Sequence, residues 1–167
     1  MFDGTYPVLM AKYNRWMNER LYAACAGLAD DERRRDRGAF FKSIHGTLDH
    51  ILWGDRLWLS RFNGKAYATG AVGELLYLDF GELQAARADM DQHILDWARA
   101  VTPEALAEAV TWTSRTYGFT QTVPRWVLVT QMFNHQTHHR GQLTTLMSQA
   151  GVDPGPTDIQ ALPLLHG

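Results

Sequence analysis

The sequence predicts an all-α protein: a four-helix bundle with a long connection between helices 2 and 3 and, before helix 4, room for a small hairpin. Two observations predict it: apolar residues recur at spacings of three and four along four long segments, and glycine or proline stands near the ends of those segments. The single cysteine, Cys25, excludes an intramolecular disulfide. With 167 residues, 46% of them hydrophobic, we expect one domain over residues 1–167.

The first helix is expected over residues 6–28, where apolar side chains repeat at helical spacing. Residues 29–38 are highly charged and have no apolar period, which indicates a solvated loop. The period resumes over residues 39–62 and predicts the second helix, which ends at an Asn-Gly pair. Residues 64–80 contain three glycines and little helical period. A long crossover between two bundle helices is therefore expected there.

The third helix is expected over residues 82–101, again from apolar spacings of three and four. A Thr-Pro pair then favours a short extra helix over residues 103–109. Residues 111–123 alternate β-formers around Tyr117 and Gly118, which allows either a small hairpin or a plain loop. The fourth helix is expected over residues 125–150. The tail is expected to wrap the surface because it contains three prolines, at Pro154, Pro156 and Pro163.

Charge and hydropathy narrow the classes of partner. Lys and Arg number 16 against 18 Asp and Glu, a net charge of −2, and the basic residues are scattered apart from one short run at Arg33, Arg34 and Arg35. Neither a nucleic acid nor an anionic membrane is therefore an expected partner. No apolar run approaches the ~18 residues of a membrane span, and the N-terminus lacks a signal-peptide pattern. Together with the lone cysteine, these features favour a cytoplasmic protein in a reducing compartment.

The histidines cluster on the predicted helices. At ~100° per residue, His135 and His139 lie about 40° apart on one face of the fourth helix, one turn from each other. His138 is rotated about 100° from His139 and is expected to face a neighbour or solvent. Two buried neutral imidazoles need partners for their ring nitrogens, and a metal ion would supply them. The apolar residues that share the face of the pair are Leu128, Met132, Leu143 and Leu146.

The second helix offers a third ligand. His45 and His50 lie about 140° apart, so only one of them can face the core. We choose His50, whose face carries small residues that leave room for a neighbouring helix or an ion, and expect His45 to stack with Asp49 nearer the edge. Three imidazoles without an acidic fourth ligand leave coordination positions open, as in catalytic zinc sites. Nickel or iron would also accept these ligands.

Several other residue types have an ordinary structural explanation. Asn14 and Asn18 repeat at one-turn spacing, and either orient the ligands or bond to a loop backbone. Cys25 is expected to be a buried thiol. Arg140 is expected to pair with a carboxylate on another helix. Gly141 is expected to allow a neighbouring helix to approach closely. Four tryptophans at helical positions are expected in the core: Trp53, Trp58, Trp97 and Trp126.

Four strings of the sequence resemble the DinB family, and the resemblance covers nearly the whole chain. They are YNRWMN at residues 13–18, SIHGTLDHILWGDRLW at 43–58, NHQTHHRGQ at 134–142 and GVDPG at 151–155. The resemblance implies a four-helix bundle, frequent homodimers and a three-histidine metal site. Matched by motif, its ligands are His50, His135 and His139, the same residues that helical spacing selects.

The resemblance also implies chemistry. Characterised relatives are transferases or isomerases that use a low-molecular-weight thiol such as bacillithiol, mycothiol or glutathione. We therefore expect a metal-dependent thiol S-transferase with a small-molecule substrate, in which the metal, zinc before nickel or iron, lowers the pKa of the thiol so that its thiolate attacks an electrophile. The alternatives are a metal-dependent hydrolase and a non-catalytic module that binds metal or a small molecule.

Overall fold

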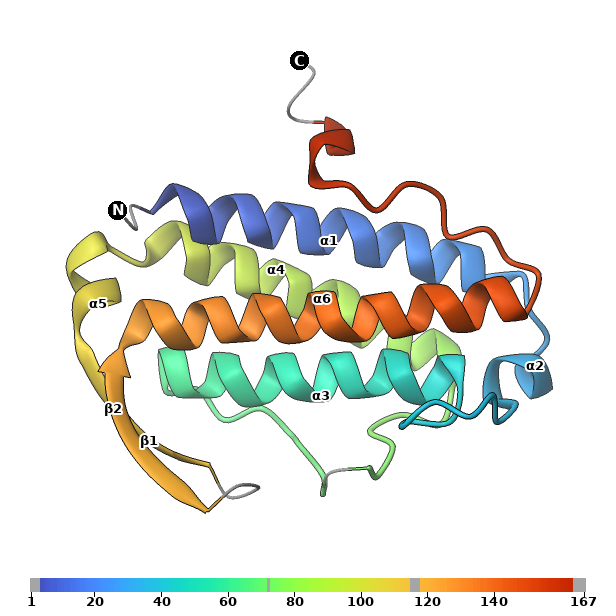
Figure 1. Cartoon of the computed structure of the whole chain (residues 1–167), viewed down its shortest axis with the longest axis horizontal. Coiled ribbons are helices and arrows are strands. Elements are labelled where there is room, and N and C mark those ends of the chain that lie inside the picture. The colour runs from blue at the N-terminus through green and yellow to red at the C-terminus, as the bar shows by residue number, and fades with distance from the viewer. Residues whose placement is uncertain (1–3, 72, 115–117, 164–167) are drawn as a thin grey trace.

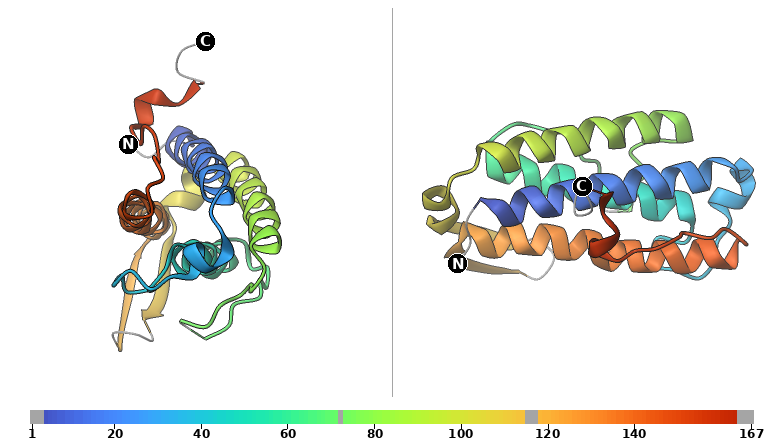
Figure 2. Two further views of the ribbon diagram at one scale, coloured as in Figure 1. Left: turned by 90° about the vertical axis from the view of Figure 1, so that its right-hand side faces the viewer. Right: turned by 90° about the horizontal axis from the view of Figure 1, so that it is seen from above.

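Four long helices lie side by side along the length of the molecule (Figure 1, Figure 2). The computed structural model describes residues 4–71, 73–114 and 118–163. Helices α1 and α6 run in one direction and α3 and α4 in the other. The end-on view places the four helices around a common core, and each contacts two of the others. Their bounds are α1 Thr5–Ala26, α3 Ile44–Asn63, α4 Phe80–Ala100 and α6 Arg125–Gln149.

The parallel course of α3 and α4 explains the long connection between them. The chain leaves α3 at one end of the molecule and must return along its full length before α4 begins (Figure 1). Two side chains of α3 fix this crossover. The Nε2–H of His45 donates to the carbonyl oxygen of Tyr77 at 2.8 Å. The two carboxylate oxygens of Asp49 accept from the backbone N–H groups of Leu76 and Tyr77, at 2.9 Å and 3.0 Å.

The second predicted helix begins later than the sequence pattern indicated. Its first residue is Ile44, because the hydroxyl of Ser43 accepts from the backbone N–H of Gly46 at 3.0 Å and so caps the helix. Residues 39–42 form a tight turn in which the backbone N–H of Lys42 donates to the carbonyl of Ala39. Phe40 and Phe41 are therefore outside the helix, where they can approach the side of α3.

Two further elements correct the prediction. A short helix, α2 (Asp30–Arg34), replaces the charged loop expected over residues 29–38; acidic residues begin it and basic residues end it, as the helix dipole favours. An antiparallel pair, β1 (Ala109–Ser114) and β2 (Phe119–Pro124), forms the hairpin that was one of two options. The protein is therefore mostly helical with a small two-stranded sheet, so the all-α class holds only in part and the possible hairpin before the last long helix is present.

The remaining connections follow their local sequence. Helix α5 (Pro103–Ala107) starts with proline, and the hydroxyl of Thr102 caps it by accepting from the N–H of Ala105 at 3.2 Å. Gly118 has a φ of 69° beside the hairpin tip, while Tyr117 lies outside the described residues. After α6 the tail runs back over the surface of the helices and contains one short 3₁₀ helix, Ile159–Ala161 (Figure 1).

A buried polar network crosses the core and links all four long helices. Asp55 of α3 and Asp91 of α4 both pair with Arg87, at 2.6 Å and 2.9 Å. Asp91 also accepts from Asn14 and Asn18 of α1, and Asp55 accepts from the Gln136 amide of α6 at 2.6 Å. Each of these side chains is almost completely buried, so one guanidinium and three amides are the partners that the two carboxylates have in place of water.

The structure tests three expectations about individual residues of the bundle. The partner of Asn14 and Asn18 is a carboxylate of another helix, and neither a histidine nor a loop backbone. Arg140 donates to the side-chain oxygen of Asn14 rather than to a carboxylate. Cys25 is buried as expected, and burial raises the pKa of its thiol to about 12.

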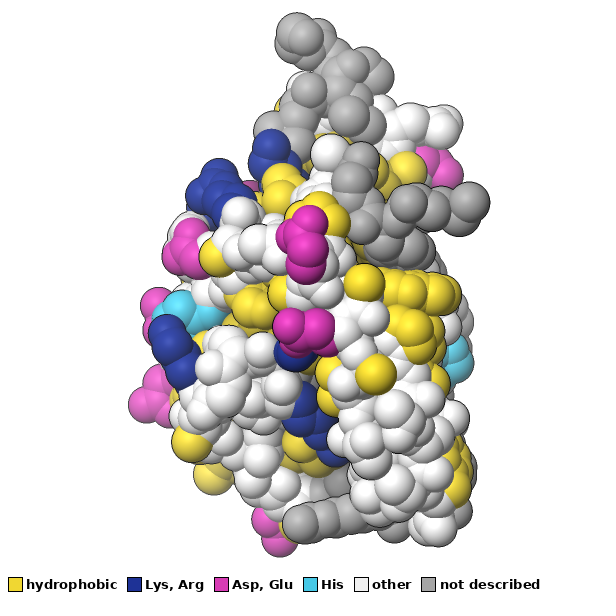
Figure 3. Space-filling model, turned by 90° about the vertical axis from the view of Figure 1, so that its left-hand side faces the viewer, with side chains coloured by type: hydrophobic (Ala, Val, Ile, Leu, Met, Phe, Trp, Pro, Cys, Tyr) yellow, Lys and Arg dark blue, Asp and Glu magenta, His cyan; other side chains and the backbone are white. Residues whose placement is uncertain are grey.

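The surface carries charges of both signs. On the end of the molecule where α5 lies, acidic and basic side chains are interspersed among hydrophobic ones (Figure 3). Trp126 is 37% exposed, which corrects its placement in the core, whereas Trp58 is buried as predicted. Across the described residues, no helix combines the length and apolar character needed to cross a membrane.

Candidate metal centre

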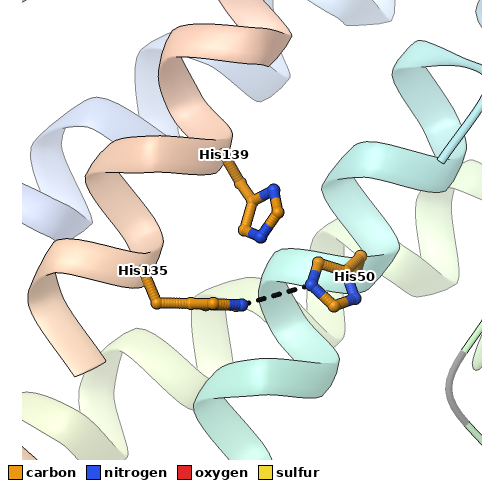
Figure 4. Close-up of side chains that lie close together, drawn as sticks. All are labelled: His50, His135 and His139. Atoms are coloured by element: carbon orange, nitrogen blue, oxygen red, sulfur yellow. Dashed lines mark hydrogen bonds between the residues drawn. The ribbon is translucent and has the colours of Figure 1, made fainter. Parts of the chain in front are cut away.

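Three histidines from two helices meet at the contact between α3 and α6. His50 comes from α3, and His135 and His139 come from successive turns of α6 (Figure 4). One nitrogen of each imidazole lies within 4.8 Å of a nitrogen of each of the others. The Nε2 atoms of His50 and His135 are 3.2 Å apart. Two nitrogens bound at ~2.05 Å to one tetrahedral ion would be about 3.3 Å apart, so His50 and His135 are spaced as two ligands of one ion such as zinc, with His139 close enough to be a third.

A glycine on α3 makes room for one of these rings. A Cβ atom built on Gly54 would lie 2.5 Å from Cε1 and 2.9 Å from Nδ1 of His135, far inside normal contact. The imidazole of His135 therefore lies directly over the backbone of α3. Its Nδ1 is buried and has no hydrogen-bond partner within the described part of the chain. Nδ1 of His135 could bind a metal ion only if the ring shifted, whereas Nε2 of His135 already faces the imidazole of His50.

A glutamine orients His139. The Nδ1–H of His139 donates to the side-chain oxygen of Gln142 at 2.8 Å, which leaves the lone pair on Nε2. Such a hydrogen bond fixes the tautomer and the ring plane of a metal-binding histidine. The amide of Gln142 also donates to Nε2 of the exposed His138 at 3.2 Å. Gln142 thus orients a candidate ligand; it lies within the NHQTHHRGQ motif, but helical spacing alone does not single it out.

Aromatic rings enclose His50. The ring of Phe41, from the turn before α3, stacks on His50 with centroids 3.6 Å apart, and Trp53 lies nearly parallel to it at 5.6 Å. Trp53 is only half-buried and its indole N–H donates to the carbonyl of Gly70 at 3.0 Å. The expectation of a core role for Trp53 is therefore wrong, since it borders a cavity of about 320 Å³ that adjoins His50.

The surroundings of the three imidazoles favour their neutral forms. Burial, together with the neighbouring histidines, lowers the pKa of His50 to about 3 and that of His135 to about 4. Burial also lowers the pKa of His139, although its bond to Gln142 acts in the opposite direction. Neutral imidazoles are the forms that bind metal, so the site is free of competing protons at neutral pH.

The other histidines of these helices lie away from the cluster. His138 is exposed, as expected from its rotation on α6. His45 is buried and bonds to the crossover, which corrects its expected place near the edge of the bundle. Gly141 is exposed with no heavy atom within 4 Å of a Cβ built there, so the close helix approach occurs at Gly54 instead.

Fold and site together define a class: a mainly helical protein in which two long helices bring three histidines together as a potential metal centre. The DinB family model matches residues 1–164, and the chain belongs to the DinB family. The resemblance seen in its motifs is thereby confirmed.

Individual relatives agree with this assignment. The chain is 24% identical to Protein DinB of Bacillus subtilis (strain 168) over 153 residues, and the match covers 88% of this chain and 87% of that protein. It is also similar to the crystal structure of a DinB-like protein from Bacillus cereus ATCC 10987, with a TM-score of 0.64 and 17% identity, over 84% of this chain and 89% of that chain. The structural similarity shows a shared fold.

Proposed function

We propose that this protein is a metal-dependent enzyme, a thiol S-transferase that joins a low-molecular-weight thiol to an electrophilic small molecule. The observation that carries the proposal is the position of the three histidines, which adjoin a cavity through His50. An ion bound by His50, His135 and His139 would have protein ligands for only three positions. A further position would remain for a substrate atom, as in catalytic rather than structural zinc sites.

The protein residues have separate roles in this proposal. His50, His135 and His139 hold a divalent metal, with zinc preferred over nickel or iron for a tetrahedral set of imidazoles. Once bound, such a metal lowers the pKa of a coordinated thiol, so that a thiolate is present at neutral pH. Gln142 keeps the ring of His139 in its ligating orientation. Phe41 and Trp53 exclude water from one side of His50.

The transfer step balances without a redox partner. The sulfur forms a bond to the electrophilic carbon of the second substrate, and the leaving group departs with its bonding electron pair. The proton of the thiol passes to solvent. The residues therefore need only to bind both substrates and to exclude competing water.

The test combines metal analysis with turnover. The purified protein is expected to contain about one equivalent of divalent metal, and to conjugate 1-chloro-2,4-dinitrobenzene to one of bacillithiol, mycothiol or glutathione. His135→Ala and His139→Ala should lose both metal and activity, because removal of one ligand of three weakens such a site severely. The matched control His138→Ala, on the same helix, should keep both.

The outcomes separate the alternatives. Ester hydrolysis by the metal-loaded protein without S-conjugation would replace the proposal with a hydrolase that uses the same histidines. Tight metal binding with neither activity would indicate a non-catalytic binding module. Loss of metal from His138→Ala but not from His135→Ala would refute the assignment of the ligands.

We also propose a homodimer. Family membership supports it, as do large apolar side chains at the surface, among which Phe40 is 80% and Leu78 is 70% exposed. Light scattering over micromolar concentrations is expected to give twice the mass of the 18.9 kDa chain. A monomer mass throughout that range would refute the proposal.

A further inference from the structure

The cavity beside His50 has apolar walls and a modest size. Its apolar lining comes from Phe40 and Phe41 of the turn before α3, Trp53 of α3 and Leu75 of the crossover. Its volume of about 320 Å³ is at the low end of the range for ligand pockets, ~300–1,000 Å³. Three of these four side chains are aromatic, and aromatic walls favour a flat apolar ligand of small size.

The acidic side chains of the cavity are already occupied by the backbone. Asp49 accepts from two N–H groups of the crossover, one through each oxygen. Glu74 accepts from the N–H of Ala71 at 3.2 Å. Lys42 also lines the cavity, and within the described part of the chain no carboxylate lies within ion-pair distance of it. Its ammonium group is therefore a cation that the cavity offers to a ligand, beside two carboxylates that are bonded to the backbone.

The backbone at Lys42 is strained in a way that singles this lysine out. Its φ is 65°, and among the described residues it is the non-glycine residue with a positive φ. The turn enforces this conformation through two bonds, from the N–H of Lys42 to Ala39 and from the N–H of Arg37 to the carbonyl of Lys42. Glycine would adopt the same geometry at lower energy. A lysine at this position therefore costs stability, and such strain is typical of functional residues.

We propose that the cavity binds a small molecule with a flat apolar body and one anionic group such as a carboxylate, and that Lys42 pairs with that anion. The apolar body contacts Phe41 and Trp53, next to His50. The assignment of this ligand as the electrophile rests on the proposed function. Binding itself needs neither the metal nor the thiol, so the two proposals can fail separately.

The test measures binding of three matched probes to the full-length protein treated with a chelator, so that a carboxylate cannot coordinate a metal. The probes are 3-phenylpropionate, 3-phenylpropanol and 3-phenylpropylamine, which differ chiefly in charge, and ligand-observed NMR gives their dissociation constants. The anion is expected to bind about three- to fivefold more tightly than the alcohol, as for a partly exposed ion pair, and the amine most weakly.

Variants assign the preference to one side chain. Lys42→Met should bind the anion no better than the alcohol, and Lys42→Glu should favour the amine. Lys65→Met, at an exposed lysine outside the cavity lining, is the control and should behave as the wild type. Equal binding of anion and alcohol by the wild type, or an unchanged preference in Lys42→Met, would overturn the proposal.

A glycine variant tests the strain and the function together. Lys42→Gly should have a higher melting temperature than the wild type, because the strain is relieved, and should lose the preference for the anion. A lower melting temperature would refute the strain argument, and a retained preference would refute the role of Lys42. A lysine with only a structural role would not give a more stable protein that binds less well.

Turnover distinguishes this proposal from the function on which it rests. The electrophiles are 1-chloro-2,4-dinitrobenzene, which is neutral, and 4-chloro-3,5-dinitrobenzoate, which is anionic. Lys42→Met should raise the ratio of KM for the anionic electrophile to KM for the neutral one. If neither electrophile is conjugated while 3-phenylpropionate binding still depends on Lys42, the thiol transferase proposal fails and the anion site stands. Equal KM changes for both electrophiles would overturn the anion site.

Discussion

Gly54 allows a direct test of the geometry of the proposed metal site, because a single added methyl group would displace one ligand. In Gly54→Ala the new Cβ would be 2.5 Å from Cε1 of His135. Carbon atoms in contact prefer ~3.5–4.0 Å, so the ring would have to move by about 1 Å. The ring cannot yield without cost, since His135 is held by α6 on one side and by the backbone of α3 on the other.

The expected effect on metal binding is large compared with the effect on the fold. Metal–ligand distances tolerate only ~0.2 Å, and disturbing the groups that position a ligand typically weakens metal binding by about 10- to 100-fold. That range corresponds to about 1.4–2.8 kcal/mol of binding free energy. An additional methyl group in a packed contact lowers the free energy of unfolding by about 1–3 kcal/mol, which a protein of this size usually survives.

The assay is a competition between the protein and a chromophoric chelator for zinc, with circular dichroism to confirm that Gly54→Ala is folded. The matched control is Gly141→Ala, on the same helix as His135, where a Cβ meets no heavy atom within 4 Å. This control should bind zinc normally and gain about 1 kcal/mol of stability, since alanine favours a helix more than glycine does. Wild-type zinc affinity in Gly54→Ala, or equal losses in both variants, would refute the reasoning.

Three further predictions concern stability. Chelation should lower the melting temperature by several degrees, since metal binding stabilises the native state by about 4 kcal/mol at a thousandfold excess over Kd; His50→Ala should remove most of this shift and remain folded, whereas a full shift would move the third ligand elsewhere, with His45 the next to test. Arg87→Met should lower the free energy of unfolding in urea by about 3–5 kcal/mol, because it leaves Asp55 and Asp91 buried without their cation; the exposed Arg99→Met is the control, and equal effects would contradict the network. The metal-free protein should lose stability as the pH falls from 7 towards 4. The unfolded chain takes up protons at histidines below pH 6.5, whereas the fold holds the pKa of His50 at about 3 and that of His135 at about 4. Each group contributes at most about 1.4 kcal/mol per pH unit, less where water reaches the ring. Melting curves of the wild type and His135→Gln should show a shallower pH dependence in the variant, and identical curves would argue against the lowered pKa.

The long helices could be predicted because their signals are local. Periodic apolar residues mark α1, α3, α4 and α6, and the Thr-Pro pair marks α5. The start of α3 was placed five residues too early, at 39 instead of 44, because apolar spacing continues through Phe40 and Phe41 while the cap at Ser43 ends the helix. Helix α2 was missed since its five residues have no apolar face; its ion pairs, such as Arg34 with Asp30, were the available signal.

Polar partners across helices could not be predicted. Asn14 and Asn18 were expected to bond to a loop or to orient histidines, yet both donate to Asp91, which is more than 70 residues away in sequence. Arg87 and Gln136 complete the same network and carry no local pattern that distinguishes them from surface residues. The pairing of such groups depends on which helices become neighbours, and helical periodicity does not specify that.

The sequence by itself determined the spacing of His135 and His139, because an α-helix places residues four apart on one face. It also determined the family, through motifs that span nearly the whole chain. Only the tertiary structure decided that His50 meets that pair, since the approach of α3 to α6 depends on the missing side chain of Gly54. It also decided the surroundings of the site. One turn places Phe41 against His50 and Lys42 in the cavity lining. Backbone hydrogen bonds between residues 37 and 42 hold this turn, and the crossover between α3 and α4 supplies the facing wall of the cavity.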